Sequence, residues 1–146
     1  MVGEGADSQI IWDRIRKHQL EYQVILPGSF DEVTDVLRAA DAFVLPSYQE
    51  GMSLSLLEAM SMRLPVIASD IPANQELIRE ANGKTFPVRN AQALSEVLLQ
   101  VLKDRTEANQ FADNAFQFVS ENYSVERMAE SHFDVIEKSI QLSVRS

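Results

Sequence analysis

Three short apolar segments, each followed by a stretch with helical spacing, constrain the fold of this chain more than any other feature. They lie at 23–27, 42–46 and 65–69, and Pro, Gly, Ser or Asp residues bound them. Their apolar residues are consecutive rather than alternate, which is typical of strands buried on both faces. Strands that alternate with helices along a chain predict a parallel sheet with helices on both of its faces.

Apolar residues at helical spacing predict where the helices lie. One helix follows Gly5, a second is capped by Asp31, a buried one covers 54–60, and Pro72 begins a short one. One more short strand is expected at 84–88, and only helices after it, the last of them capped by Ser124. The apolar faces of this helical C-terminal tail are Leu94, Val97, Leu98, Val101 and Leu102, then Phe111, Ala112, Ala115 and Val119, and last Val125, Met128, Ala129, Phe133, Ile136 and Ile140.

The composition fits one α/β domain and excludes several classes of function. A chain of 146 residues without cysteine has no disulfide and no thiolate metal site. Its 13 basic and 22 acidic residues give a net charge of −9, which argues against nucleic acid as a partner. With His18 and His132 as the only histidines, no metal site is expected. No apolar run is long enough to span a bilayer and the start lacks the features of a signal peptide, so we expect a cytoplasmic protein.

The first residues resemble the end of a strand that enters a tight turn at Gly3 and Gly5. Met1 and Val2 alone are too few to hold a place in a sheet. We therefore expect residues 1–146 to be a single domain truncated at its N-terminus, with a preceding strand and a partner domain absent. The hydrophobic surface left exposed predicts self-association, with an apparent size above that of a monomer at high concentration.

Glu50 and Glu58 are the main candidates for a chemical role. Their spacing alone is uninformative, because Glu occupies 13 of the 146 positions. Their context says more, since Glu50 follows the carboxyl end of the predicted strand at 42–46, where open parallel sheets bind ligands. A helix is expected to begin near Met52 or Ser53, and the free N–H groups and positive dipole end at its start form an anion site.

A nucleotide sugar fits this arrangement. Its pyrophosphate would lie over the backbone N–H groups of residues 51–54, with a carboxylate for a sugar hydroxyl at each end. Glu58 is expected roughly 8–12 Å from Glu50, at about 1.5 Å per helical residue. The same residues also fit a structural interpretation, in which Glu50 stabilises the helix dipole and Glu58 is a solvated surface residue.

The segment around these glutamates resembles a known family. Residues 46–60, Pro-Ser-Tyr-Gln-Glu-Gly-Met-Ser-Leu-Ser-Leu-Leu-Glu-Ala-Met, are followed by Leu-Pro-Val-Ile-Ala-Ser at 64–69 and by Glu76-Leu. Together they resemble the C-terminal domain of the retaining glycosyltransferases of the GT-B fold, family 4, and the resemblance covers nearly the whole chain. It implies a Rossmann-like parallel sheet. It also implies a full enzyme that transfers a sugar from a nucleoside-diphosphate sugar to an acceptor hydroxyl with retention, in polysaccharide or glycolipid synthesis.

The resemblance also implies roles for individual residues. Glu50 is the catalytic residue beside the donor sugar, and Glu58 contacts the ribose of the nucleotide. The residues whose backbone contacts sugar, phosphates or nucleotide are Gly51, Met52, Ser53, Leu54 and Gly28. The resemblance implies no metal and no cofactor. The acceptor-binding N-terminal domain, and any membrane contact made through it, would lie outside this chain.

Two residues depart from the family pattern and keep other interpretations open. Ser53 stands where the family commonly has Gly and is expected to narrow the site or to change how the backbone approaches the ligand. Arg63 stands where a small residue usually precedes the Leu-Pro-Val run. The family's cations that neutralise the diphosphate precede this chain, so weak donor binding and no useful turnover are expected of it alone. The alternatives are a non-catalytic interaction module of the same fold, a nucleotide-sugar epimerase and an unrelated α/β domain.

Overall fold

The computed structural model describes residues 7–30 and 32–124, together with residues 126, 127, 129, 133, 136 and 140. The chain divides into two compact units, Met1–Asp35 and Val36–Ser146, and each is considered by itself. The predicted turn at Gly3 and Gly5 and the predicted N-cap at Asp31 lie outside the described residues. None of the helices in the described part of the chain is long and apolar enough to cross a membrane.

The first unit contains a helix but no strand among its described residues. Helix α1 (Ser8–Lys17) confirms the helix predicted after the glycine turn. The strand predicted at 23–27 is wrong, and Ile25 within it is 70% exposed. A strand needs a neighbour to pair its backbone N–H and C=O groups, and no described strand pairs with this segment. Its backbone instead forms a local hydrogen bond, from the N–H of Val24 to the carbonyl of Leu20 at 2.9 Å.

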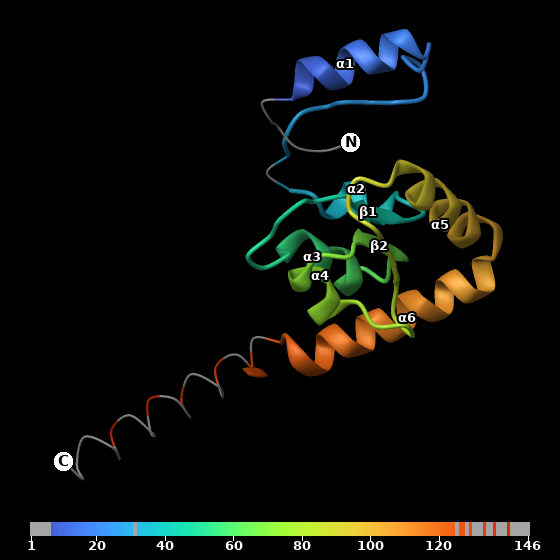
Figure 1. Ribbon diagram of the computed structural model, residues 1–146. Coiled ribbons are helices and arrows are strands. Elements are labelled where there is room, and N and C mark those ends of the chain that lie inside the picture. Colours follow the sequence, from blue (N-terminus) through green and yellow to red (C-terminus); the bar gives the residue numbers. More distant parts are fainter. Residues whose placement is uncertain are drawn as a thin grey trace. The chain divides into compact units, whose positions relative to one another are not determined.

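The second unit is built on a three-stranded parallel sheet (Figure 1). Its strands, in spatial order, are β1 (Phe43–Leu45), β2 (Val66–Ser69) and β3 (Lys84–Phe86). All three lie where the sequence predicts them, and β3 ends before Pro87, which has no N–H for a ladder. The register pairs Val44 with Ile67 and Ser69 with Phe86. Every residue of β2 is buried, because β2 is the central strand and both of its faces are covered.

Helices cover both faces of this sheet, as predicted (Figure 1). They are α3 (Leu54–Ser61), α4 (Pro72–Leu77), α5 (Ala91–Lys103) and α6 (Arg105–Asn122). A further helix, α2 (Thr34–Arg38), spans the boundary between the two units. Ile67 and Phe86 pack with Val101 of α5 in a buried cluster on one face. Val66 and Ala68 alternate to the opposite face, and α3 packs against β1 and β2. Right-handed crossovers between parallel strands place α3 and α4 on the same face.

A single residue joins the two long helices of the tail. Asp104 ends α5 and begins α6, and its Oδ1 accepts a hydrogen bond of 2.9 Å from the N–H of Glu107. Ser124 Oγ accepts a hydrogen bond of 3.2 Å from the N–H of Arg127, which is the cap predicted for the last helix. The predicted apolar face of α6 is buried at Phe111, Ala112, Ala115 and Val119. Of the face predicted for the last helix, Ala129, Phe133, Ile136 and Ile140 are exposed, whereas Val125 and Met128 lie outside the described residues.

Candidate functional site

The loop between β1 and α3 carries most of the residues predicted for the site. It leaves the carboxyl end of β1, and α3 then begins at Leu54 with Ser53 as its N-cap. Glu50 is half-buried in this loop, and Glu58 is exposed on α3. The exposed residues around the start of α3 are Gly51, Met52 and Leu54. Gly28 lies in the first unit with a φ of 86°, a left-handed conformation that favours glycine.

A chain of hydrogen bonds connects this loop to β2 and α4. Ser53 Oγ donates to Asn74 Oδ1 at 2.6 Å, and Asn74 Nδ2 donates to the backbone carbonyl of Ser69 at 2.8 Å. Ser69 Oγ donates to the backbone carbonyl of Ser47, and Ser47 Oγ donates to Glu50 Oε1 at 2.6 Å. These hydrogen bonds therefore join the start of α3, the end of β2, α4 and the Glu50 carboxylate. We call Ser47, Glu50, Ser53, Ser69 and Asn74 the polar network.

Three members of the polar network are almost fully buried. The residue exposures are 2% for Ser53, 1% for Ser69 and 0% for Asn74. A buried polar group destabilises a fold unless it is hydrogen-bonded. Among the described residues, every buried side-chain nitrogen or oxygen has a partner. The polar network is therefore fully satisfied, which favours one fixed arrangement of the loop.

The Ser53 side chain does not narrow the open side of the loop, which is one of the two effects that the sequence led us to expect. Its side chain points inward, where its hydroxyl is held by Asn74. A glycine at this position would leave Asn74 Oδ1 without that donor. The serine and the asparagine are therefore best understood as a pair.

The backbone at the start of α3 offers unpaired donors. The N–H groups of Gly51, Met52 and Ser53 have no hydrogen-bond partner within the described ranges. The N–H of Leu54 instead donates to the carbonyl of Met52 at 3.0 Å. A Cβ placed on Gly51 would meet no atom within 4 Å, so the space beside this residue is open. The positive end of the α3 dipole and three N–H groups without a backbone partner thus lie in one loop, and the space beside Gly51 in that loop is open.

Arg63, the second departure from the family pattern, lies at the other end of α3. Its Nη1 is 2.7 Å from Asp113 Oδ1, and its Cζ is 4.1 Å from the ring centroid of Phe116. Both partners belong to α6. Arg63 therefore takes part in helix packing away from the start of α3.

Arg89 is a residue near the candidate site that the sequence did not indicate. It follows β3 in a left-handed conformation, with a φ of 63°, and its Cζ lies 5.2 Å from the ring centroid of Tyr48. Tyr48 precedes Glu50 by two residues and is 67% exposed. A cation thus lies against the site loop, at the same carboxyl edge of the sheet. The two residues are far apart in sequence, so only the fold brings them together.

The sequence also gave no role to Ser47, Ser69 and Asn74, although one signal was present. Asn74 precedes Leu77 and Ile78 by three and four positions, so it shares their buried helix face. A polar side chain on a buried face must find hydrogen-bond partners. The identity of those partners depends on how α4 packs against β2, which a local pattern does not specify.

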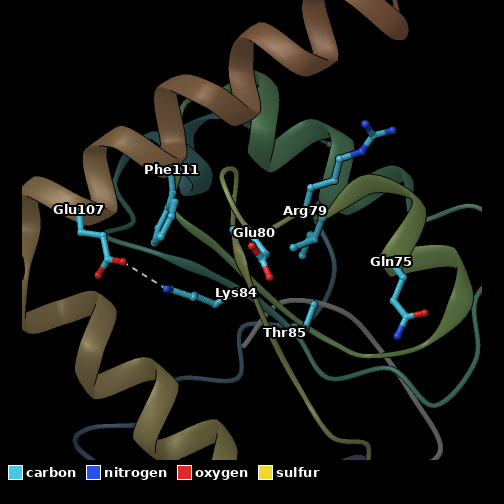
Figure 2. A pocket seen from close by; sticks show the side chains of 9 residues that line it. Gln75, Arg79, Glu80, Lys84, Thr85, Glu107 and Phe111 are labelled. Atoms are coloured by element: carbon cyan, nitrogen blue, oxygen red, sulfur yellow. Dashed lines mark hydrogen bonds and ion pairs between the residues drawn. The ribbon is translucent and has the colours of Figure 1, made fainter.

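A pocket of the second unit lies elsewhere, between α4, β3 and α6. Its volume is about 820 Å³, and it is lined by Gln75, Ile78, Arg79, Glu80, Gly83, Lys84, Thr85, Glu107 and Phe111. Figure 2 shows Glu107 and Phe111 on α6 pointing toward Lys84. Lys84 Nζ is 3.2 Å from Glu107 Oε1 and 4.5 Å from the ring centroid of Phe111. Lys84 begins β3, so this pocket opens near the amino ends of the strands, and no residue of the polar network lines it.

Comparison with known sequences relates the chain to one family. Residues 1–118 match the profile of the family described as "Glycosyl transferases group 1". The lipopolysaccharide core biosynthesis mannosyltransferase LpsB of Rhizobium meliloti (strain 1021) is 29% identical over 120 residues, which are 80% of this chain and 34% of that protein. The chain spans only about a fifth to two fifths of the length of the curated relatives compared, from 21% to 37%.

Comparison with solved structures agrees with this family. Sucrose-phosphate synthase from Thermosynechococcus elongatus matches 97% of this chain and 36% of its own, with a TM-score of 0.86 and 28% identity. A variant of TarM from S. aureus, in complex with fondaparinux, alpha-GlcNAc-glycerol and UDP, matches 91% of this chain and 27% of its own. Its TM-score is 0.83 and its identity 28%. The α/β fold predicted from the sequence, and its resemblance to one half of a GT-B protein, are confirmed.

Proposed function

Because the chain belongs to the glycosyl transferases group 1 family, we propose that it is the donor-binding domain of a retaining glycosyltransferase. Its ligand is a nucleoside-diphosphate sugar, and the full enzyme transfers the sugar to an acceptor hydroxyl in polysaccharide or glycolipid synthesis. One observation carries the proposal. The loop after β1 combines a carboxylate held by a hydrogen bond, three N–H groups without a backbone partner and an open space beside Gly51.

The proposed chemistry follows from the charges that develop during transfer. As the bond to the diphosphate breaks, positive charge grows on the sugar and negative charge on the leaving phosphates. Glu50 would stabilise the sugar cation, while the N–H groups of residues 51–53 and the α3 dipole would stabilise the diphosphate. Glu58, exposed four residues after the helix begins, would accept hydrogen bonds from the ribose hydroxyls. TarM, 28% identical to this chain, was crystallised with UDP, which supports a nucleotide of this class.

The interaction-module alternative loses part of its support. It rested on Ser53 and Arg63 as departures from the family pattern, and on the truncated start expected from the sequence. Ser53 is turned into the polar network, and Arg63 contacts α6 at the far end of α3. Neither side chain obstructs the space beside Gly51.

Calorimetric titration tests the proposal directly. The chain is titrated with UDP, GDP and ADP and with their glucose or mannose conjugates. We expect one base to bind and Glu58→Ala to weaken that binding about 10-fold or more, because hydrogen bonds to a charged group contribute roughly 1.5–3 kcal/mol. Glu50→Ala should remove the additional affinity that the sugar confers and leave the affinity for the diphosphate unchanged.

Glu80→Ala is the matched control. Glu80 is an exposed glutamate that lines the pocket near the amino ends of the strands, so its removal should leave donor binding unchanged. If Glu80→Ala abolishes binding and Glu58→Ala does not, the ligand binds in that pocket and not at the loop after β1. Absence of binding by every conjugate at millimolar concentration would contradict a donor site on this chain.

A further inference from the structure

We propose that Asn74 is the positioning residue that sets the start of α3 and the Glu50 loop relative to one another. This inference rests on the proposed function, because it concerns how the donor site is held in shape. Asn74 itself is fully buried and touches no ligand. It acts through Ser53 on one side and through Ser69 and Ser47 on the other.

The first side of the polar network holds the three unpaired N–H groups. Ser53 is the N-cap of α3, yet its side chain makes no capping hydrogen bond to the helix. Its hydroxyl is 2.6 Å from Asn74 Oδ1 instead. The backbone of residues 51–53 is therefore anchored to α4 rather than by the local cap that serine usually provides.

The second side holds the carboxylate. Asn74 Nδ2 lies 2.8 Å from the carbonyl and 3.3 Å from the hydroxyl of Ser69, and that hydroxyl donates to the carbonyl of Ser47. The Ser47 hydroxyl then donates to Glu50 at 2.6 Å. Ser47 thus links the two parts with two different groups, since its backbone carbonyl accepts from Ser69 and its hydroxyl donates to Glu50.

An asparagine is required at this position because both functions of its amide are used. The oxygen accepts from Ser53, and the nitrogen donates to Ser69. Aspartate would keep the acceptor, lose the donor and bring a buried charge against a carbonyl oxygen. A shift of about 1 Å in a positioned group can cost as much as 100-fold in rate. The two halves of the proposed site are thus coupled through one buried amide.

Asn82 provides a matched control for removal of a buried amide. It is 4% exposed, its Oδ1 accepts from the N–H of Arg79 at 2.6 Å, and its Nδ2 donates to the carbonyl of Leu77 at 3.1 Å. It lies after α4, near the amino end of β3, and both of these hydrogen bonds join it to residues outside the polar network. Asn82→Ala therefore removes the same chemical group from the same unit without touching the loop.

The experiment compares Asn74→Ala with Asn82→Ala by amide hydrogen exchange and by titration. The N–H groups of Leu56 and Leu57 report on the start of α3, since both donate to the carbonyl of Ser53. In Asn74→Ala we expect their exchange to be about 10-fold faster relative to amides of α6, whereas Asn82→Ala should speed all amides alike. Affinity for the best-binding diphosphate among UDP, GDP and ADP should fall on the order of 10-fold in Asn74→Ala alone.

Two milder variants separate the two sides and serve if Asn74→Ala does not fold. Ser53→Gly should speed exchange at Leu56 and Leu57 and weaken diphosphate binding. Ser47→Ala should leave the affinity for the diphosphate unchanged and remove the additional affinity of its glucose conjugate. If the Asn74, Ser53 and Asn82 variants show the same exchange rates and the same diphosphate affinity, the positioning role is overturned, even if nucleotides bind. If exchange at Leu56 and Leu57 becomes faster only in the Asn74 and Ser53 variants, but the chain binds no nucleotide, the positioning role is supported and the proposed function is contradicted.

Discussion

At the scale of single residues, two glycines of the second unit have opposite surroundings. A Cβ on Gly83 would lie 2.8 Å from Val66 Cγ2 and 3.1 Å from the Val66 carbonyl oxygen. The first contact is shorter than real Cβ atoms show and the second is tight, and Val66 is buried in the central strand and cannot move aside easily. Gly51 has no atom within 4 Å of the same position. Packing within the protein therefore requires glycine at position 83. At position 51 the protein itself leaves room for a side chain, so only a bound ligand would require glycine there.

Gly83→Ala and Gly51→Ala should therefore have opposite consequences. We expect Gly83→Ala to lower the free energy of unfolding by roughly 1–3 kcal/mol, the usual cost of overpacking a core. Gly51→Ala should leave it within about 0.5 kcal/mol but weaken donor binding, since the new methyl group takes space the ligand needs. Urea unfolding and calorimetric titration on both variants measure the two effects. Unchanged donor affinity in Gly51→Ala would mean that no ligand lies against this residue.

At the scale of elements, the sequence predicted the second unit well and one segment of the first unit badly. The segments at 42–46 and 65–69 became β1 and β2, and each has a neighbouring strand to pair with. The equally apolar segment at 23–27 has no described strand beside it. Apolar patterning shows that a segment can be a strand, but only a partner supplies the ladder of hydrogen bonds. The same limit applies to the candidate site, where the loop after a predicted strand suggested Glu50, whereas the partners of Asn74 depend on packing.

Helix α3 ends in an arrangement in which an arginine occupies a position that favours glycine. The N–H of Leu64 donates to the carbonyl of Ala59 and the N–H of Arg63 to that of Met60, both at 3.1 Å. These are the two hydrogen bonds of a Schellman motif. Arg63 is the residue of this motif that has the left-handed conformation, with a φ of 55°. The strain is offset by an exposed ion pair with Asp113 and by stacking on Phe116.

Arg63→Ala should destabilise the unit more than Arg63→Gly. Alanine loses the ion pair and the stacking, together about 1 kcal/mol, and keeps the left-handed strain. Glycine loses the same contacts but removes strain of roughly 1 kcal/mol, so its net effect should be near zero. Urea midpoints compare the two variants. Arg105→Ala, which removes only an exposed ion pair with Asp41, is the control. Equal losses in both Arg63 variants would show that the left-handed position carries no strain.

At the scale of the whole molecule, the described sheet has an end strand with one partner. β1 pairs with β2 alone among the described strands, so the backbone groups on its other edge have no strand to bond. Large apolar side chains are also exposed, among them Met52, Leu54, Phe133 and Ile136. An unpaired edge and exposed apolar surface both favour association between copies.

Association should therefore rise with concentration. We expect light scattering to give an average mass of about 16.4 kDa in dilute solution and a larger value as the concentration increases. Association driven by apolar contact should persist at high salt, because screening weakens only charge interactions. A mass that stays at the monomer value over the whole concentration range would contradict this prediction.

The adjacent positions of Asn82 and Gly83 also determine how the protein ages. In an Asn-Gly pair, the backbone nitrogen of the glycine readily attacks the side-chain carbonyl carbon of the asparagine, which releases ammonia and closes a succinimide ring. Water then opens this ring to give aspartate or isoaspartate. In the folded unit, both ends of the Asn82 amide are tied to α4 and the segment after it, so the attack is held off. An unfolded chain has no such protection, and a carboxylate at position 82 has no proton to donate to the Leu77 carbonyl. We therefore expect that longer times in the unfolded state convert more chains at position 82, and that a smaller fraction of the chains then refolds.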